Sequence, residues 1–235
     1  MRDLIYNQDL VERRPVGITD GLISLVEDSS GRCDEIIQAH HYSHKTTKNR
    51  FLSFLINGGL GAIQLGYGIR PKMKHTISTE ITADNFCEFD RMWLSDDLPK
   101  FSESRTIGLL LSYIKRVHSR IKFIITYADE SAGNKGTIYK ATNAIQLESV
   151  KCDFYILPDG ERIHPVSMYH RHKTRAKAFV EKQYPGIKHI NGEFQQFRFL
   201  YILDNKLRRK FQGRNGSPPD CKDGFNSHTP LQIPA

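Results

Sequence analysis

Hydrophobic residues recur at helical spacing in one long stretch near the middle of the chain. Over residues 106–121 they follow the i, i+3, i+4, i+7 pattern, and basic residues occupy the remaining face. This periodicity predicts an amphipathic helix, with Ser102 or Ser104 available to cap its N-terminus. The apolar positions are Ile107, Leu110, Leu111, Ile114, Val117 and Ile121.

Shorter apolar runs, bounded by turn residues, predict strands on both sides of this helix. Two of them, at residues 51–56 and 61–69, flank an Asn-Gly-Gly turn, whose chemistry predicts a β-hairpin. Further strands are predicted over residues 86–94, 150–157 and 195–203. A short helix ending near Tyr42 and a basic helix over residues 175–183 are also predicted, whereas residues 1–28 show no pattern that places them.

Residues 123–143 combine a strand, a polar loop and a helix. The apolar run ends at Asp129, a loop rich in Gly and Asn follows, and Tyr139 lies in the first turn of the next helix. Ligands and catalytic groups of α/β sheets gather at such strand ends. Asp129 and Tyr139 are therefore candidate site residues; the alternative is a solvated acid at a strand end and a tyrosine of the core.

The order of predicted elements, β-β-β-α-β-α-β, describes a single α/β sheet domain. We expect this domain to cover residues 1–212, with a basic C-terminal part at residues 162–212. Residues 213–235 are rich in Gly, Pro, Ser and Asn, which predicts a flexible tail.

The composition is typical of a soluble globular protein, with 39% hydrophobic and 26% charged residues. No apolar run approaches the ~20 residues that a membrane helix needs, and the first residues do not read as a signal peptide. The four cysteines lie far apart and predict neither a zinc knuckle nor a disulfide framework. We therefore expect a cytoplasmic protein without a membrane partner.

The net charge of +8 is concentrated in the C-terminal part of the chain. Residues 162–214 hold 13 lysines and arginines against only three acids, with aromatic residues interleaved. A localised basic surface with aromatics suits a polyanion such as DNA or RNA. The alternative is a solvated helix face, although the excess of positive charge is greater than solubility requires.

Metal-ligand residue types follow the first predicted helix. His41 and Tyr42 stand side by side where the backbone can leave the helix, and Asp129 adds a carboxylate. Imidazole, phenolate and carboxylate are competent ligands, and the two oxygen donors favour iron over zinc. The alternative is that these histidines are surface groups or nucleic-acid contacts of a basic protein.

Arg91, Ser104 and Arg105 form a candidate anion site just before the long helix. A helix N-terminus offers free N–H groups and a positive dipole end, to which Ser104 could add a donor and either arginine a charge. The glycines of a Walker or dinucleotide loop are absent, and serine caps are common in helices. Tyr139 carries a phenol, which is a poor base near neutral pH but a serviceable acid for a leaving group.

These motifs occur together in an order that resembles the Mom-like family of phage DNA-modification proteins. The resemblance runs from His40 to His164 and is most specific in the segment YADESAGNKGTIYKATN. It implies a fold like that of the GNAT acyltransferases, in which helices flank a mixed central sheet. It also implies an enzyme that converts adenine in DNA to N6-carbamoylmethyladenine and so protects phage DNA from host restriction.

The resemblance also implies roles for individual residues. The implied iron ligands are His41, Tyr42 and Asp129. The implied catalytic and cofactor-binding residues are Arg91, Ser104, Asp129 and Tyr139, beside which Arg105 is a further candidate for the cofactor. A phage or prophage origin and the cytoplasm of the host cell follow from the same resemblance.

The donor of the transferred group stays open. Attack of adenine N6 on a thioester would give an N-acyl adenine, whereas the implied product joins N6 to a CH2 group. The segment SESRTIG also replaces the Gly-rich loop of ordinary GNAT enzymes. The candidates are acyl-CoA or another acyl or aminoacyl donor, and a redox-capable iron would also help to explain the product.

The implied partner is DNA, either as a duplex with the target adenine flipped out or as a single strand. Residues 162–214 would then follow the phosphates, and Trp93 and Tyr67 are candidate stacking aromatics. A homodimer is an open alternative to a monomer. Two rival functions remain: a GNAT-type acyltransferase acting on a small-molecule or protein amine, and a non-catalytic DNA-binding protein.

Overall fold

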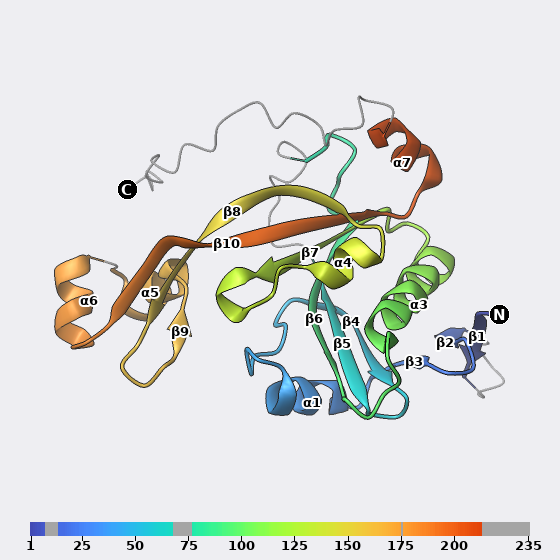
Figure 1. Cartoon of the computed structure of the whole chain (residues 1–235), viewed down its shortest axis with the longest axis horizontal. Helices are drawn as coiled ribbons and strands as arrows, with labels where there is room; N and C mark the ends of the chain where they lie inside the picture. The colour runs from blue at the N-terminus through green and yellow to red at the C-terminus, as the bar shows by residue number, and fades with distance from the viewer. Residues whose placement is uncertain (8–13, 68–76, 175, 213–235) are drawn as a thin grey trace.

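A computed structural model of the protein describes residues 1–7, 14–67, 77–174 and 176–212. Its ten strands form one sheet in the order β1-β2-β3-β4-β5-β6-β7-β10-β8-β9 (Figure 1). Strands β6 and β7 are parallel and all other neighbours are antiparallel, so the sheet is mixed. Helices flank this sheet, which confirms the predicted α/β class. The single domain over residues 1–212 stays a prediction, and the expected tail at residues 213–235 lies outside the described residues.

The sheet and its helices account for most of the described chain. The strands are β1 (Asp3–Tyr6), β2 (Pro15–Thr19), β3 (Ser24–Glu27), β4 (Arg50–Ile56), β5 (Gly61–Gly66), β6 (Phe86–Leu94), β7 (Phe123–Asp129), β8 (Ile145–Ile156), β9 (Arg162–Ile163) and β10 (Lys188–Ile202). The helices are α1 (Arg32–His40), α3 (Ser102–Val117), α4 (Thr137–Ala141), α5 (Pro165–His172), α6 (Lys177–Gln183) and α7 (Asn205–Gln212). None of these described helices is long and apolar enough to cross a membrane.

The elements with strong hydrophobic patterns lie where the sequence predicts them. Strand β6 has the predicted bounds, and the β4–β5 hairpin turns at Asn57 and Gly58, both with positive φ as the Asn-Gly-Gly turn requires. Strands β1 to β3 were not predicted, because they have four or five residues and few of their side chains are buried. Helices α5 and α7 were missed for a similar reason, since each has few apolar residues.

Helix α3 begins and ends four residues earlier than its apolar pattern predicts. Its N-cap is Phe101, with φ of 68°, and no side chain caps it. The hydroxyl of Ser102 donates to the carbonyl of Pro99, and that of Ser104 donates to the carbonyl of Phe101 at 3.0 Å. The predicted serine cap is therefore wrong, because both hydroxyls bond to the turn that precedes the helix.

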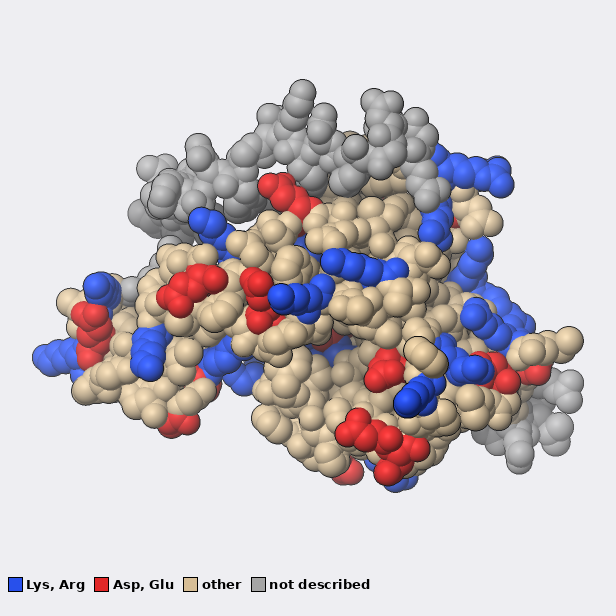
Figure 2. All heavy atoms as spheres, in the orientation of Figure 1, with Lys and Arg blue, Asp and Glu red and all other residues tan. Residues whose placement is uncertain are grey.

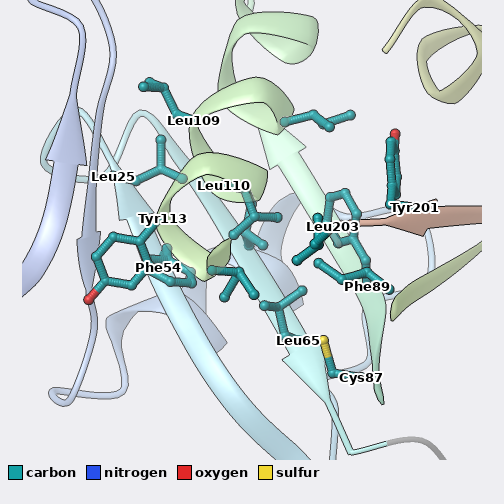
Figure 3. Packing of buried hydrophobic residues seen from close by; sticks show 14 of the residues in the cluster. Leu25, Phe54, Leu65, Cys87, Phe89, Leu109, Leu110, Tyr113, Tyr201 and Leu203 are labelled. Carbon is teal, nitrogen blue, oxygen red and sulfur yellow. The ribbon is translucent and has the colours of Figure 1, made fainter. Parts of the chain in front are cut away.

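The sheet separates two hydrophobic clusters, since side chains alternate along β7 and β10. Ile124 and Phe199 face α3, whereas Ile125 and Leu200 face the opposite side, where Leu207 of α7 packs. Figure 3 shows the larger cluster, in which α3 lays a row of side chains across β4, β5 and β6. Full burial of each large side chain contributes about 1.5–3 kcal/mol, so this cluster fixes α3 on the sheet.

Strands β8 and β10 extend beyond the rest of the sheet as a two-stranded arm (Figure 1). The arm, residues 151–195, begins where the pairing of β10 with β7 stops at Gln196 and Asp129. It carries β9, α5 and α6. Its own hydrophobic cluster comprises Tyr155, Leu157, Ile163, Met168 and Val180.

The basic C-terminal part does not form one continuous surface. Residues 162–188 belong to the arm, whereas α7 lies at the other end of β10, a strand of 15 residues that spans about 50 Å. Three of the arm's cations are also neutralised by ion pairs, Arg162 with Asp129, Arg171 with Glu161, and Lys177 with Glu181. The basic residues of this part of the chain, although close in sequence, therefore lie on two separate parts of the surface.

Glycine at position 136 is required by both space and backbone conformation. Its φ is +71°, and a Cβ there would lie 2.2 Å from the ring of Phe199. Gly133 has a similar φ of +77°, but a Cβ there would meet nothing within 4 Å.

We expect Gly133→Ala to cost about 1 kcal/mol through the left-handed backbone alone, and Gly136→Ala about 1–3 kcal/mol more. Urea unfolding of the two variants measures the difference, and equal losses would show that Phe199 tolerates the methyl group.

Glu27 joins β3 to α3 through the side chain of Tyr113, whose hydroxyl lies 2.7 Å from Glu27 Oε1. Burial alone would raise the pKa of Glu27, but His118, 3.6 Å away, and the hydrogen bond from Tyr113 together outweigh it, so the pKa is lowered from 4.5. The stabilisation by ionised Glu27 is thus complete above pH 4.5 and is lost as the pH falls through the lowered pKa.

We expect Glu27→Gln to cost about 1–3 kcal/mol at neutral pH. Below pH 4.5, the difference in the free energy of unfolding between wild type and Glu27→Gln should become smaller, as measured by urea unfolding. A difference that does not change with pH would contradict stabilisation by ionised Glu27.

Candidate active site

The site lies where the parallel strands β6 and β7 separate. The two strands pair only as far as Phe89 and Thr126, although β6 continues to Leu94 and β7 to Asp129. The hydroxyl of Thr126 donates to the carbonyl of Phe89 at 3.0 Å and closes the end of the paired region. Beyond this point the facing strand edges do not pair with each other, so their backbone groups are available to a ligand.

A β-bulge in β6 sets the direction of Arg91. In the β5–β6 register, Leu65 pairs with Phe89 and Gln64 with Arg91, so Asp90 is the extra residue. Bulges of this kind redirect side chains and are common beside active sites. The Arg91 guanidinium donates to the carbonyl of Lys45 at 3.0 Å and to that of Asp90 at 2.7 Å.

Tyr139 belongs to α4 and lies at the point where β6 and β7 separate. It is 8% exposed, and its ring packs near Phe89 and Phe199. Its hydroxyl is hydrogen-bonded to Thr126, at the closed end of the pairing between β6 and β7. Burial raises the pKa of Tyr139 above its usual value of 10, with Thr126 opposing the shift. The phenol is therefore protonated at neutral pH, and its predicted role as an acid stays a prediction.

Asp129 ends β7 and uses both carboxylate oxygens. Oδ1 accepts the backbone N–H of Ser131 at 2.9 Å and the Ser131 hydroxyl, and Oδ2 lies 3.0 Å from an Arg162 nitrogen. The same Arg162 nitrogen donates to Ser131 Oγ at 2.7 Å. The guanidinium also lies 3.9 Å over the ring of Phe154. The arm thus holds the predicted acid through a residue that the sequence analysis did not single out.

The thiol of Cys152 lies beside the same carboxylate, with Sγ 3.7 Å from Asp129 Oδ1. Burial raises the pKa of this thiol to about 11, and the charge of Asp129 adds to the shift. Cys152 is therefore a neutral thiol near pH 7, and it is a poor nucleophile in this position.

The loop between α1 and β4 brings His41 and Tyr42 to the site. Helix α1 ends at His40, and His41 has extended backbone angles, which confirms that the chain leaves the helix there. His41 is buried, and its Nδ1 accepts the backbone N–H of Ser43 at 3.2 Å. Burial, together with the charge of Arg91, lowers the pKa of His41 to about 4, so the ring is neutral.

Tyr42 is 57% exposed, and three charged groups surround it. The part of its ring that packs on His41 is shielded from water, and this partial burial raises the pKa of the phenol. Arg91 opposes the shift, Asp129 adds to it, and Arg162 opposes it. Tyr42 also interacts electrostatically with Tyr139. The structure therefore brings together five residues from three separate segments of the sequence: His41, Tyr42, Arg91, Asp129 and Tyr139.

Lys45 ties this loop to both sides of the site. Its carbonyl accepts from Arg91, and its ammonium group donates to the carbonyl of Arg162 at 3.1 Å. The same ammonium group lies 3.8 Å from Glu161. No local sequence signal marks Lys45 or Arg162, because their partners are up to 117 positions away. Ser131 bonds to Asp129 two positions earlier, so the Asp-Glu-Ser sequence is the one local signal that could have indicated it.

Ser104 and Arg105 lie apart from this group of residues. Ser104 is in the first turn of α3, and Arg105 forms an ion pair with Asp20 at 2.9 Å, in the turn between β2 and β3. In the described part of the chain, no hydrogen bond or ion pair links either residue to Asp129 or Tyr139. The proposed role of Arg105 in binding a cofactor would require it to leave Asp20.

The predicted iron ligands have suitable chemistry, but Asp129 is already engaged. A neutral imidazole, a phenol and a carboxylate are acceptable donors to iron. Both oxygens of Asp129, however, bond to Arg162 or Ser131, so a metal would have to replace the guanidinium. Among the described residues, no three His, Cys, Asp or Glu side chains form a metal-binding group. Tyr42 would therefore have to supply the third ligand beside His41 and Asp129.

The candidate stacking aromatics have neighbours of their own. The Trp93 ring stacks on His40 of α1 with 4.3 Å between ring centroids. Tyr67 lies against Phe51 at 5.2 Å and remains 46% exposed. Trp93 would have to give up this stacking to receive a base.

Solved acetyltransferase structures are similar to this chain in outline. A probable acetyltransferase of the GNAT family from Chromobacterium violaceum has a TM-score of 0.47 and 7% identity, covering 80% of this chain and 86% of its own. The ribosomal-protein-S5-alanine acetyltransferase of Vibrio fischeri has a TM-score of 0.47 and 8% identity, covering 81% of this chain and 98% of its own. At these values the likeness says nothing of substrate, donor or activity.

The sequence comparisons cover more of the chain and are more specific. Residues 25–219 match the family model described as the Mom protein family. A relative described as methylcarbamoylase Mom, from Escherichia phage Mu, is 31% identical over 178 residues. This match covers 74% of the present chain and 73% of the relative. The chain belongs to the Mom protein family.

Proposed function

We propose that this protein is a DNA-modifying transferase that converts adenine to N6-carbamoylmethyladenine and shields phage DNA from host restriction. The observation that carries the proposal is the match, over most of both chains, to a relative from phage Mu described as a methylcarbamoylase. The proposal includes a phage or prophage origin and action in the cytoplasm of the host cell. A homodimer stays a prediction.

The geometry of the site supports this reaction in three ways. Tyr139 is a buried, protonated phenol and can give a proton to a leaving group. Arg91, next to the unpaired edge of β6, can orient the charged part of a donor. Asp129 lies at the end of β7 beside the exposed Tyr42, where an extruded base can enter.

The donor is acyl-CoA or another acyl or aminoacyl carrier. The backbone N–H of Ser102 already donates to the carbonyl of Pro99, but no side chain caps α3, so the next N–H groups of its first turn, with Ser104 beside them, can bind an anionic part of such a donor. The unpaired edges of β6 and β7 can hydrogen-bond an extended chain with amide groups. The target adenine is met in single-stranded DNA or flipped out of a duplex.

Expression in bacteria followed by mass spectrometry of digested plasmid nucleosides tests the activity. Wild type should yield deoxyadenosine carrying a carbamoylmethyl group. Tyr139→Phe should lower the yield about 100-fold or more, because it removes the proposed acid. Tyr201→Phe is the matched control, since it removes another buried phenol, one that bonds to Thr142 at 2.6 Å, and should leave the yield unchanged.

Two results would contradict the proposal. Unmodified deoxyadenosine from folded wild-type protein, together with acyl-CoA turnover in the absence of DNA, would support an acyltransferase for another amine. Salt-sensitive DNA binding without any modification, unaffected by Tyr139→Phe, would support a non-catalytic DNA-binding protein.

Iron binding by His41, Tyr42 and Asp129 is part of the proposal and has its own test. We expect iron in the purified wild-type protein and a loss of most of it in Asp129→Ala, because a ligand carboxylate is removed. Asp153→Ala is the control, since this exposed acid pairs only with His189 on the arm. Elemental analysis measures the iron content. Equal iron in the two variants would rule out Asp129 as a ligand.

A further inference from the structure

Basic side chains gather at the end of the molecule opposite the arm (Figure 2). They come from the end of α3, the segment that follows it, and α7. We call them the α3–α7 patch: Lys115, Arg116, Arg120, Lys122, Lys206, Arg208, Arg209 and Lys210. Asp204 is the only acid within residues 115–122 and 204–210. The first half of this patch lies outside the basic C-terminal part of the sequence.

Contacts between the two helices make the patch continuous. Lys115 Nζ lies 3.5 Å from Asn205 Oδ1, and Lys122 Nζ lies 3.9 Å from Asp204 Oδ2. The backbone N–H of Leu203 also donates to the carbonyl of Lys122. Residues separated by about 80 positions in the sequence therefore share one surface.

Most cations of the α3–α7 patch have no acid beside them. Lys122 pairs with Asp204 and Lys210 with Glu80, but the other six form no ion pair with any described residue. Favourable interaction with the helix dipole can explain cations in the last turn of a helix. It cannot explain Arg120, which lies beyond α3, whereas Lys206 in the first turn of α7 is close enough to Asp204 to lower the pKa of that carboxyl. An anionic partner would explain Arg120 and why the other cations without ion pairs gather beside it.

The patch lies at a fixed distance from the site. Lys122 immediately precedes β7, and Asp129 ends that strand, so seven residue steps of about 3.3 Å separate them by about 23 Å. Leu207 and Phe211 place α7 on the same face of the sheet as Ile125 and Tyr127, which is also the face of Asp129. A duplex advances 3.4 Å per base pair, so about 23 Å corresponds to about seven base pairs.

We propose that the α3–α7 patch binds the phosphate backbone of duplex DNA about seven base pairs to one side of the adenine in the site. The inference rests on the proposed function and adds the form of the substrate. A duplex fits better than a single strand, because its stiffness over such lengths preserves a fixed spacing between patch and site. The arm, whose cations are partly neutralised, contributes less to this binding.

Binding measured against salt concentration tests the patch. Arg120→Gln with Arg209→Gln removes one exposed cation from each side of the patch, neither of which forms an ion pair in the described structure. The slope of log affinity against log salt should become shallower by about 2, at about 0.9 per phosphate contact. Arg32→Gln with Lys140→Gln is the matched control, as both are exposed and lie on α1 and α4; its slope should equal that of wild type.

Duplex design locates the contact. Duplexes centred on a target adenine and cut to about three base pairs on one side or the other should differ in the salt dependence of binding, since the patch is about seven base pairs away. With the duplex shortened on the side of the patch, the double variant and wild type should have the same slope of log affinity against log salt. With the duplex shortened on the other side, the two slopes should still differ. An unchanged slope, or equal effects with both shortened duplexes, would overturn the inference. The slope does not depend on modification, so a failure of the proposed function would leave this readout intact.

Discussion

The ion pair between Asp129 and Arg162 joins the two parts of the molecule that make the site. Asp129 belongs to the end of β7 in the central sheet, and Arg162 belongs to β9 on the arm. The pair is partly buried, with 18% and 37% of the two side chains exposed, and Ser131 and Phe154 hold the guanidinium in place. Partly buried pairs of this kind contribute more to orientation than to stability, because desolvation offsets much of the attraction.

The other residues of the site take their positions from this junction and from the separation of β6 and β7. Lys45 bonds to Arg162 on one side and to Arg91 on the other, so the loop that carries His41 and Tyr42 is held across the junction. Tyr139 enters from the opposite face of the sheet, on a helix that Gly136 allows to lie close to Phe199. Neutral His41, protonated Tyr139 and ionised partners of Asp129 therefore meet in a space bordered by unpaired strand edges.

Local patterns predicted the parts of the fold that local physics determines. The apolar run of β6, the periodicity of α3 and the Asn-Gly-Gly turn each reflect burial or backbone preference within a few residues. The strand, loop and helix around Asp129 and Tyr139 were predicted for the same reason. The short strands β1 to β3 were not, because they have four or five residues and bury few side chains. Arg162 and the α3–α7 patch were also missed, since both depend on contacts between distant segments.

A double-mutant cycle on the rate of adenine modification tests most directly whether Arg162 acts through Asp129. The rates of wild type, Asp129→Asn, Arg162→Gln and the double variant would be compared on one DNA substrate. We predict that Arg162→Gln slows modification about tenfold or more in the wild-type background and has little effect in Asp129→Asn, a coupling of more than about 1 kcal/mol. Equal effects of Arg162→Gln in both backgrounds would show that the two residues act independently and that their ion pair does not organise the site.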